Sequence, residues 1–453
     1  MKPIDSDRSF RVLSIFLIFI SSFLLAIWSL KNTIALRNSL LALGAIASLW
    51  MLIGPQKVLA KIPKSRLFPE LTPIILSGCM FIWVLIHCLF FSQELTLQLQ
   101  ELNGTWSRAL LACLIGTATG LVLRDRPILN QFLWFGLLAS FIYLLAHYLQ
   151  AFSQSNLSFM PNYYFSSPFG NKINTVLMGN LFIAAICGSA ADAIKAKQNK
   201  LPWWIYPYWV LGAFIILFSF TIIIDTRNGI GVALILISSW LIYVGGIIIK
   251  RQFNSSRFNW KYAALLVIPF FILIFFIYQH LSINRGWNHF IDDINVAVQI
   301  DKVPNWKNIP KYGYPNTATG EQVYPNNYER AAWATAGIET IAQNPLGFGL
   351  LEHSLGKLIH KSYPDAIIQS AHSAWIDYGL ALGLPGLFFT IGALISILFL
   401  AYKSQSPQRL TAIWITGGLL ITFTVAEVSS KHTIEILFFF IAMLNTALLR
   451  QKN

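Results

Sequence analysis

A histidine stands where a long polar segment of the chain gives way to an apolar one. His372 follows the polar residues 282–371, and the apolar run after it carries Gly379, Gly383 and Gly386. Imidazole titrates near neutral pH, so a histidine can remove a proton from a hydroxyl group or orient that group for attack. A position between water and lipid suits chemistry on an amphipathic substrate.

Three basic residues elsewhere in the chain are candidates for binding an anion. Arg227 lies in a short turn between two apolar runs, where a charge is costly unless it faces protein or a wet cavity. Arg330 and Lys172 fall near the starts of expected helices, where a cation opposes the helix dipole unless an anion compensates it. Guanidinium groups bind phosphate oxygens through paired hydrogen bonds, so a lipid-anchored phosphate would fit these residues.

Each of these cations also has a structural interpretation. Lys172 could extend its amine to the membrane interface, Arg227 could pair with Asp225 in the turn, and Arg330 could be an ordinary surface arginine. The sequence leaves these alternatives open.

The composition indicates an integral membrane protein. Of the 453 residues, 55% are hydrophobic and 11% are charged, whereas soluble proteins carry about 25% charged residues. Apolar runs of about 20 residues predict about twelve membrane-spanning helices. We expect them near residues 11–30, 33–54, 71–92, 107–123, 128–150, 173–192, 205–224, 229–249, 262–281, 380–402, 409–427 and 433–449. The predicted fold class is therefore an all-α integral membrane protein.

The placement of basic residues predicts the orientation in the membrane. With the N-terminus in the cytoplasm, most of the 33 lysines and arginines fall on the cytoplasmic side, as is typical of multispanning proteins. The net charge of +14 thus reflects orientation, and we expect membrane lipids but no nucleic acid as partners. We expect three parts: helices one to nine in residues 1–281, a large outer loop in 282–371, and helices ten to twelve in 372–453.

The outer loop between the ninth and tenth helices is too long for a simple connector, so we expect it to be partly helical. A helix is predicted near 328–343, preceded by Asn326 and Asn327 and followed by Pro345. The aromatic stretch 304–316 could stack on sugar rings or pack its own rings into a compact loop.

Acidic residues give weaker signals. Glu427 and Glu435 flank the last outer turn, where they could shape the site or face solvent, and of these alternatives we expect the second. Asp292 and Asp293 form an adjacent pair without the Asp-x-Asp spacing of metal-dependent glycosyltransferases, so we interpret them as a solvated loop pair. No metal site is predicted.

Several of these motifs, taken in order, resemble the O-antigen ligase and polymerase superfamily. The resemblance rests on Thr226-Arg227, on Tyr328-Glu329-Arg330-Ala331-Ala332-Trp333, on Asn344-Pro345-Leu346-Gly347, and on His372-Ser373 followed by Gly379, Gly383, Pro385 and Gly386. It covers the helix count, the position of the loop and the C-terminal half to about residue 390, whereas the N-terminal third is similar only in hydropathy.

The resemblance implies a glycosyltransferase of the bacterial inner membrane with its active site facing the periplasm. The donor would be a glycan on undecaprenyl diphosphate, and the acceptor a sugar hydroxyl of lipid A-core, which completes lipopolysaccharide. His372 would act as the base or orienting group for that hydroxyl, and Arg227 and Arg330 would bind the donor diphosphate. Lys172, at the outer mouth of the sixth helix, joins this set. Transfer is expected to invert the anomeric carbon and to need no metal or other cofactor.

Other functions remain as alternatives. An O-antigen polymerase or a protein O-oligosaccharyltransferase would share the donor, the loop and the histidine motif. We favour the ligase because the Tyr-Glu-Arg-Ala-Ala-Trp and His-Ser-x-Trp-x-Asp forms most resemble ligase sequences. A flippase or transporter is less consistent with the sequence, because its charges usually lie near the middle of the bilayer and its halves often repeat.

Overall fold

The computed structural model describes residues 4–53, 67–155, 163–195, 202–253, 289–352, 354–428 and 432–450, together with scattered positions between 267 and 287. Within this part of the chain the regular elements are all helices, and the only β pairing is an isolated bridge between Asn316 and Gln322. The predicted all-α class is confirmed.

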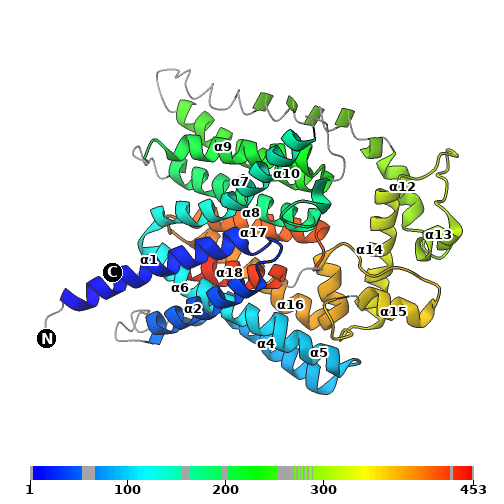
Figure 1. The fold of residues 1–453 in the computed structure, drawn as a ribbon, viewed down its shortest axis with the longest axis horizontal. Coiled ribbons are helices and arrows are strands. Elements are labelled where there is room, and N and C mark those ends of the chain that lie inside the picture. Colours follow the sequence, from blue (N-terminus) through cyan, green and yellow to red (C-terminus); the bar gives the residue numbers. More distant parts are fainter. Residues whose placement is uncertain are drawn as a thin grey trace.

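Long apolar helices form a bundle (Figure 1). They are α1 (Ile4–Ile27), α2 (Ile34–Ile53), α4 (Thr72–Phe90), α6 (Ser107–Asp125), α7 (Asn130–Gln154), α8 (Lys172–Lys195), α9 (Ile205–Phe218), α10 (Arg227–Phe253), α16 (Ala374–Lys403), α17 (Arg409–Val425) and α18 (His432–Ala447). Among the described residues, nine helical stretches are long and apolar enough to cross a membrane, and α17 and α18 are shorter apolar helices. Every predicted span except the ninth has a counterpart here; the ninth, near 262–281, lies mostly outside the described residues.

The centre of the bundle is α18, whose residues are buried along its whole length. It packs most closely on α6, where Gly116 and Gly120 face its backbone. A Cβ atom at Gly116 would lie 2.2 Å from the carbonyl oxygen of Phe439, and one at Gly120 would lie 2.1 Å from that of Met443. These two glycines, four positions apart, therefore allow the backbones of α6 and α18 to touch.

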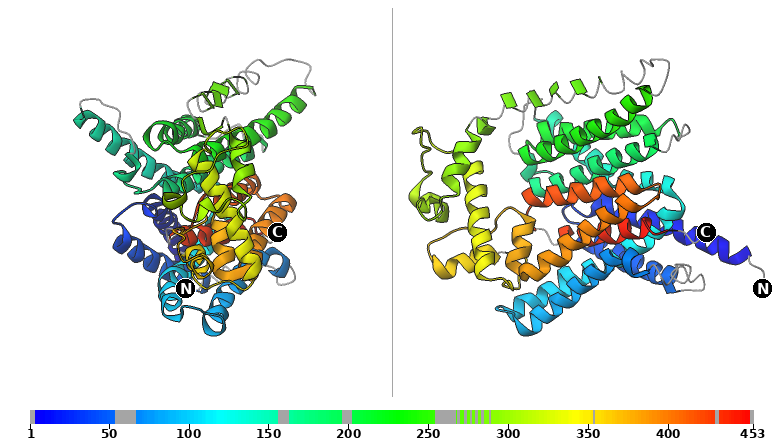
Figure 2. Two further views of the ribbon diagram at one scale, coloured as in Figure 1. Left: turned by 90° about the vertical axis from the view of Figure 1, so that its right-hand side faces the viewer. Right: turned by 180° about the vertical axis from the view of Figure 1, so that it is seen from behind.

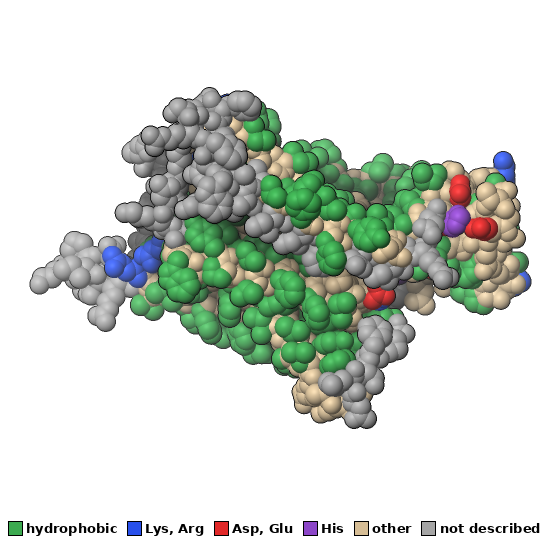
Figure 3. Space-filling view, turned by 90° about the horizontal axis from the view of Figure 1, so that it is seen from above, with side chains coloured by type: hydrophobic (Ala, Val, Ile, Leu, Met, Phe, Trp, Pro, Cys, Tyr) green, Lys and Arg blue, Asp and Glu red, His purple; other side chains and the backbone are tan. Residues whose placement is uncertain are grey.

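The outside of the bundle is apolar. Figure 3 shows a flank covered by hydrophobic side chains, with most of the charged side chains in that view at the two ends. Ile242, Val210 and Phe388 are each more than half exposed, although they are large apolar residues. Apolar side chains pointing outward from several helices are what contact with lipid requires.

Between α10 and α16 the chain forms a helical cap at one end of the bundle, which we call the α14 end (Figures 1 and 2). Its helices are α12 (Phe290–Ala297), η8 (Pro304–Lys307), α13 (Ile309–Tyr312), α14 (Pro325–Gln343) and α15 (Ser354–Ser362). In Figure 1, α14 runs across the bundle axis. It includes the predicted 328–343 segment but begins a turn earlier, because Pro325 presets the backbone angle of a first helical turn.

The cap has a hydrophobic core of its own. Tyr328 and Ala332 of α14 are fully buried there with Trp306, Phe348 and other side chains. The indole of Trp306 donates to the carbonyl of Ile300, so this ring of the aromatic stretch packs within the protein. A link to the bundle comes from Glu101, at the end of α5 (Leu95–Glu101), whose carboxylate accepts from the backbone N–H of Leu351 at 3.0 Å.

Helix α16 is broken at Gly383, which has φ 67° and ψ −167°. The segment 345–349 hydrogen-bonds across the break: Phe348 N–H donates to Leu380 O, Gly349 N–H to Ala381 O, and Leu384 N–H to Pro345 O. From the other side, the indole of Trp83 in α4 donates to Leu382 O at 2.8 Å. The N-terminal half of α16, which follows His372, is thereby fixed to both the cap and the bundle.

We expect Gly383→Ala to lower the stability of the folded protein. A side chain is strained at this backbone conformation, at a cost of about 1–3 kcal/mol, and its Cβ would lie 2.2 Å from Pro345 O. Thermal unfolding in detergent should show a lower melting temperature than wild type. Gly417→Ala in α17 is the matched control, since a Cβ there meets nothing within 4 Å; an equal effect of the two changes would contradict the assignment.

Candidate functional site

His372 lies immediately before α16 and has the unusual φ of 54° for a residue with a side chain. Its imidazole Nδ1 is 2.6 Å from Oε2 of Glu427, an ion-pair distance when the ring is protonated. The indole of Trp333 lies beside the imidazole, with ring centroids 5.3 Å apart. A carboxylate at Nδ1 favours the tautomer in which Nε2 can accept a proton from another group.

The position of Glu427 corrects the sequence-based expectation. It was expected to face solvent, but its side chain is only 12% exposed and also accepts a 2.6 Å hydrogen bond from Ser370. The chain after α17 folds back over the start of α16, where Ala374 N–H donates to Ala426 O. Val428 N–H donates to the buried carboxylate of Asp377. These contacts place Glu427 beside the histidine, forming the His372–Glu427 pair.

Arg330 approaches the same pair from α14. Its Nη1 donates to the carbonyl of Val425 at 3.3 Å. Burial lowers the pKa of this guanidinium, the nearby Glu427 carboxylate opposes that effect, and the charge of Arg227 adds to it. Arg330 and Trp333 are three residues apart and so lie on one face of α14, directed at His372 and its surroundings.

Arg227 is the first residue of α10, and its contacts are with the cap. Its Nη1 donates to Oδ1 of Asn327 at 3.3 Å, and its guanidinium lies 4.6 Å from the ring centre of Tyr324. The pairing with Asp225 considered for this turn is replaced by these contacts. Asn228 and Gly229 lie in the first turn of α10, and Asn228 donates to the same Val425 carbonyl as Arg330.

Lys172 is the first residue of α8. Its Nζ donates to the backbone carbonyl of Asp225 at 2.9 Å and lies 4.5 Å from the ring centre of Tyr164. Asp225 is two residues before Arg227, and Asn228, the residue after Arg227, shares the Val425 carbonyl with Arg330. The structure therefore brings Lys172, Arg227 and Arg330 together, and we call them the cation triad.

Two further acidic residues are buried where solvent exposure was expected. Asp293 is fully buried in α12, which is a helix instead of a loop, and it accepts from Tyr324 N–H at 3.1 Å and Asn327 Nδ2 at 2.8 Å. Glu435 is also fully buried, because the first turn of α18 lies inside the bundle and not at its surface. Among the described residues, no three His, Cys, Asp or Glu side chains are grouped as metal ligands.

In chemical terms, the site offers a histidine held by a carboxylate and, next to it, three cations contributed by α8, α10 and α14. The triad can neutralise a diphosphate, and the histidine can take a proton from a hydroxyl placed against Nε2. The arrangement suits the displacement of an anionic leaving group by an alcohol.

We expect Asp293→Ala to loosen the cap, because it removes the acceptor of the Tyr324 N–H and one of the two acceptors of the Asn327 amide, which also donates to Gly286 O. Each buried donor left unpaired costs about 1–3 kcal/mol. Limited proteolysis should cut the α12–α14 region faster than in wild type. Asp292→Ala changes the neighbouring exposed carboxylate and should leave the rate unchanged; faster cleavage in both variants would argue against this role.

A known protein family is similar to the part of the chain that contains most of this site. Residues 212–391 match the model of a protein family described as O-antigen ligase. The matched segment contains Arg227, Arg330 and His372, whereas Lys172 and Glu427 lie outside it. No curated protein matches the chain.

Proposed function

We propose that this protein, whose residues 212–391 match the O-antigen ligase family, transfers a glycan from undecaprenyl diphosphate to a sugar hydroxyl of lipid A-core. The reaction would complete lipopolysaccharide at the periplasmic face of the bacterial inner membrane. One observation carries the proposal: the His372–Glu427 pair and the cation triad meet at the α14 end of a membrane bundle. A base close to a group of cations is what such a transfer needs.

In the proposed mechanism, the acceptor hydroxyl attacks the anomeric carbon of the donor sugar. Nε2 of His372 takes the hydroxyl proton while the bond between that carbon and the diphosphate oxygen breaks. Glu427 stabilises the imidazolium that forms, because its carboxylate lies 2.6 Å from Nδ1. Arg227, Arg330 and Lys172 stabilise the negative charge that develops on the departing lipid diphosphate. Direct attack of this kind inverts the anomeric configuration.

The proposed orientation puts the α14 end in the periplasm. It follows from the excess of basic residues in the segments at the other end of the helices, given an N-terminus in the cytoplasm. Both substrates are anchored in the membrane, so a site at the ends of the helices lies level with their head groups.

Deletion of the gene in its own host tests the ligase assignment. We expect polymer to accumulate on the lipid diphosphate while lipid A-core stays bare, as measured by electrophoresis and mass spectrometry of extracted glycolipids. Lipid A-core carrying a single repeat would instead identify a polymerase. Unchanged lipopolysaccharide with loss of glycan from a protein would identify a protein O-oligosaccharyltransferase.

We expect His372→Ala to abolish transfer and Glu427→Gln to lower kcat by about a hundred-fold, within the range measured for general base catalysis. The glutamine keeps the shape of the side chain but removes the charge that stabilises the imidazolium. Transfer would be measured with purified protein and both lipid substrates. His360→Ala, at an exposed position on α15, is the control. Full activity in either site variant would exclude its proposed role.

Arg227→Lys should raise the KM for the donor about ten-fold or more. Lysine keeps the positive charge but loses the planar fork that holds two phosphate oxygens. Arg251→Lys at the other end of the same helix, where Arg251 donates to Ile194 O, is the matched control. A donor KM equal to that of the control would show that Arg227 has only a structural role, through its contacts with the cap.

A further inference from the structure

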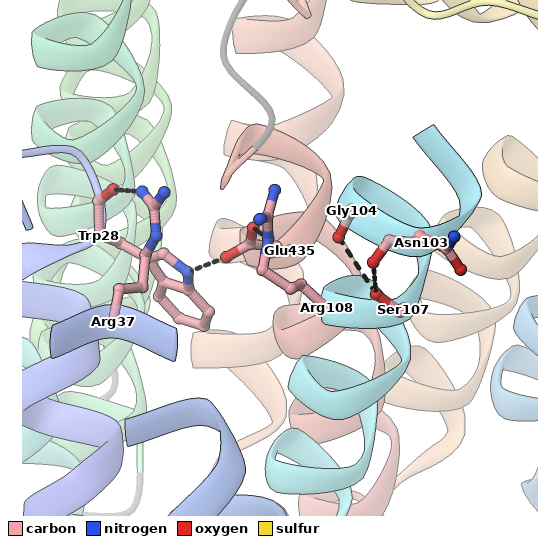
Figure 4. Close-up of polar contacts among 7 residues, drawn as sticks. All are labelled: Trp28, Arg37, Asn103, Gly104, Ser107, Arg108 and Glu435. Atoms are coloured by element: carbon pink, nitrogen blue, oxygen red, sulfur yellow. Dashed lines mark hydrogen bonds and ion pairs between the residues drawn. The ribbon is translucent and has the colours of Figure 1, made fainter. Parts of the chain in front are cut away.

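A second group of charged side chains lies inside the bundle, apart from the site described above (Figure 4). Glu435 of α18 is its centre: Trp28 Nε1 donates to Oε2 at 2.6 Å, and Arg108 Nε donates to Oε1 at 2.7 Å. Arg37 of α2 donates through Nη1 to the carbonyl of Trp28 at 2.8 Å. Trp28 follows the end of α1, and the other three side chains occupy the first turns of α2, α6 and α18.

The charges of this group do not balance. Two arginines face a single carboxylate, and both Arg37 and Glu435 are buried, with Arg37 only 7% exposed. Within the described part of the chain, Nε of Arg37 is buried and has no hydrogen-bond partner. Arg108 is 18% exposed and reaches Glu435 through Nε, one of its five N–H groups. A buried excess of positive charge is costly, and an anion would reduce that cost.

This group and the cation triad are separate centres at the same end of the bundle. The electrostatic neighbours of Arg37 are Glu435 and Arg108, whereas those of Lys172 are Asp225, Arg227 and Arg330. Between them lies a pair of side chains, His432 at the start of α18 and Asn174 in the first turn of α8, whose Nε2 and Oδ1 atoms are 3.1 Å apart. The α14 end therefore carries two cationic centres, one on each side of this polar pair.

We propose that Arg37 and Arg108 bind the phosphate group of the second lipid substrate, the acceptor glycolipid. The inference rests on the proposed function, in which two lipid-anchored molecules must be held at one membrane surface. One cationic centre lies beside the His372–Glu427 pair and suits the leaving diphosphate. The other lies inside the bundle, where Arg37 and Arg108 outnumber the single carboxylate of Glu435, so it has positive charge left over for a phosphate.

A purely structural role makes a different prediction. If Glu435 and Arg108 serve only to tie α18 to α6, removing either charge should harm the protein equally. If the arginines bind phosphate, removing the carboxylate leaves more positive charge for the ligand. Arg108→Gln and Glu435→Gln should therefore have opposite effects on phosphate binding. Arg124→Gln is the matched control, because Arg124 is paired with Asp125 at the far end of the same helix.

Binding would be measured without donor, using purified protein in phosphatidylcholine nanodiscs and lipid A-core with and without its phosphates. We expect wild type to bind the phosphorylated form about ten-fold more tightly, a readily measured difference. Arg108→Gln should lose this preference and raise the acceptor KM with the donor KM unchanged. Glu435→Gln should keep or increase the preference, and Arg124→Gln should match wild type.

Several results would overturn the proposal. Equal binding of the two lipids by wild type would contradict it, and so would loss of binding of the phosphorylated lipid to the same extent in Arg108→Gln and Glu435→Gln. A rise in the donor KM for Arg108→Gln would contradict it too. Competition by phosphatidylglycerol as strong as that by lipid A-core would identify a general lipid site. The wild-type comparison decides the matter even if Arg108→Gln fails to fold. The binding assay needs no turnover. Loss of transferase activity would therefore refute the proposed function, whereas the binding measurements test the phosphate site on their own.

Discussion

The short chain between α17 and α18 is the constraint on which the site depends. The carbonyl of Val425 accepts from Arg330 of the cap and from Asn228 of α10, while Ala426 and Val428 bond to the first turn of α16. Three segments far apart in sequence are thus joined to consecutive peptide groups. Glu427, in the middle of this stretch, can then reach His372 only in the geometry that these bonds impose.

The three cations of the site come from different helices. Cations held close together repel one another whichever helices carry them, so each needs oxygen acceptors nearby. Here α8, α10 and α14 contribute one cation each, and backbone carbonyls or amide oxygens partly satisfy every one of them. In the described part of the chain, Glu427 is the carboxylate that contacts the histidine, so a base and an anion site can be neighbours without cancelling each other.

The sequence predicted those parts of the fold that depend on local physics. Apolar runs located the bundle helices, and the motifs around Arg227, Arg330 and His372 pointed to residues that the structure brings into one region. Glu427, Glu435 and Asp293 were wrongly expected in solvent, because their partners are distant in sequence and a carboxylate near a helix start usually faces water.

The break in α16 also bears on how the protein is made. A helix interrupted at Gly383 leaves backbone groups that hydrocarbon cannot satisfy. One of them, the Leu382 carbonyl, is met by Trp83 of α4, which leaves the ribosome about 300 residues earlier at the usual order of synthesis. Trp83 is therefore synthesised before the carbonyl that it binds, and α4 can be in the bilayer when α16 is inserted. Loss of α4 would therefore leave the break in α16 without one of its hydrogen-bond donors.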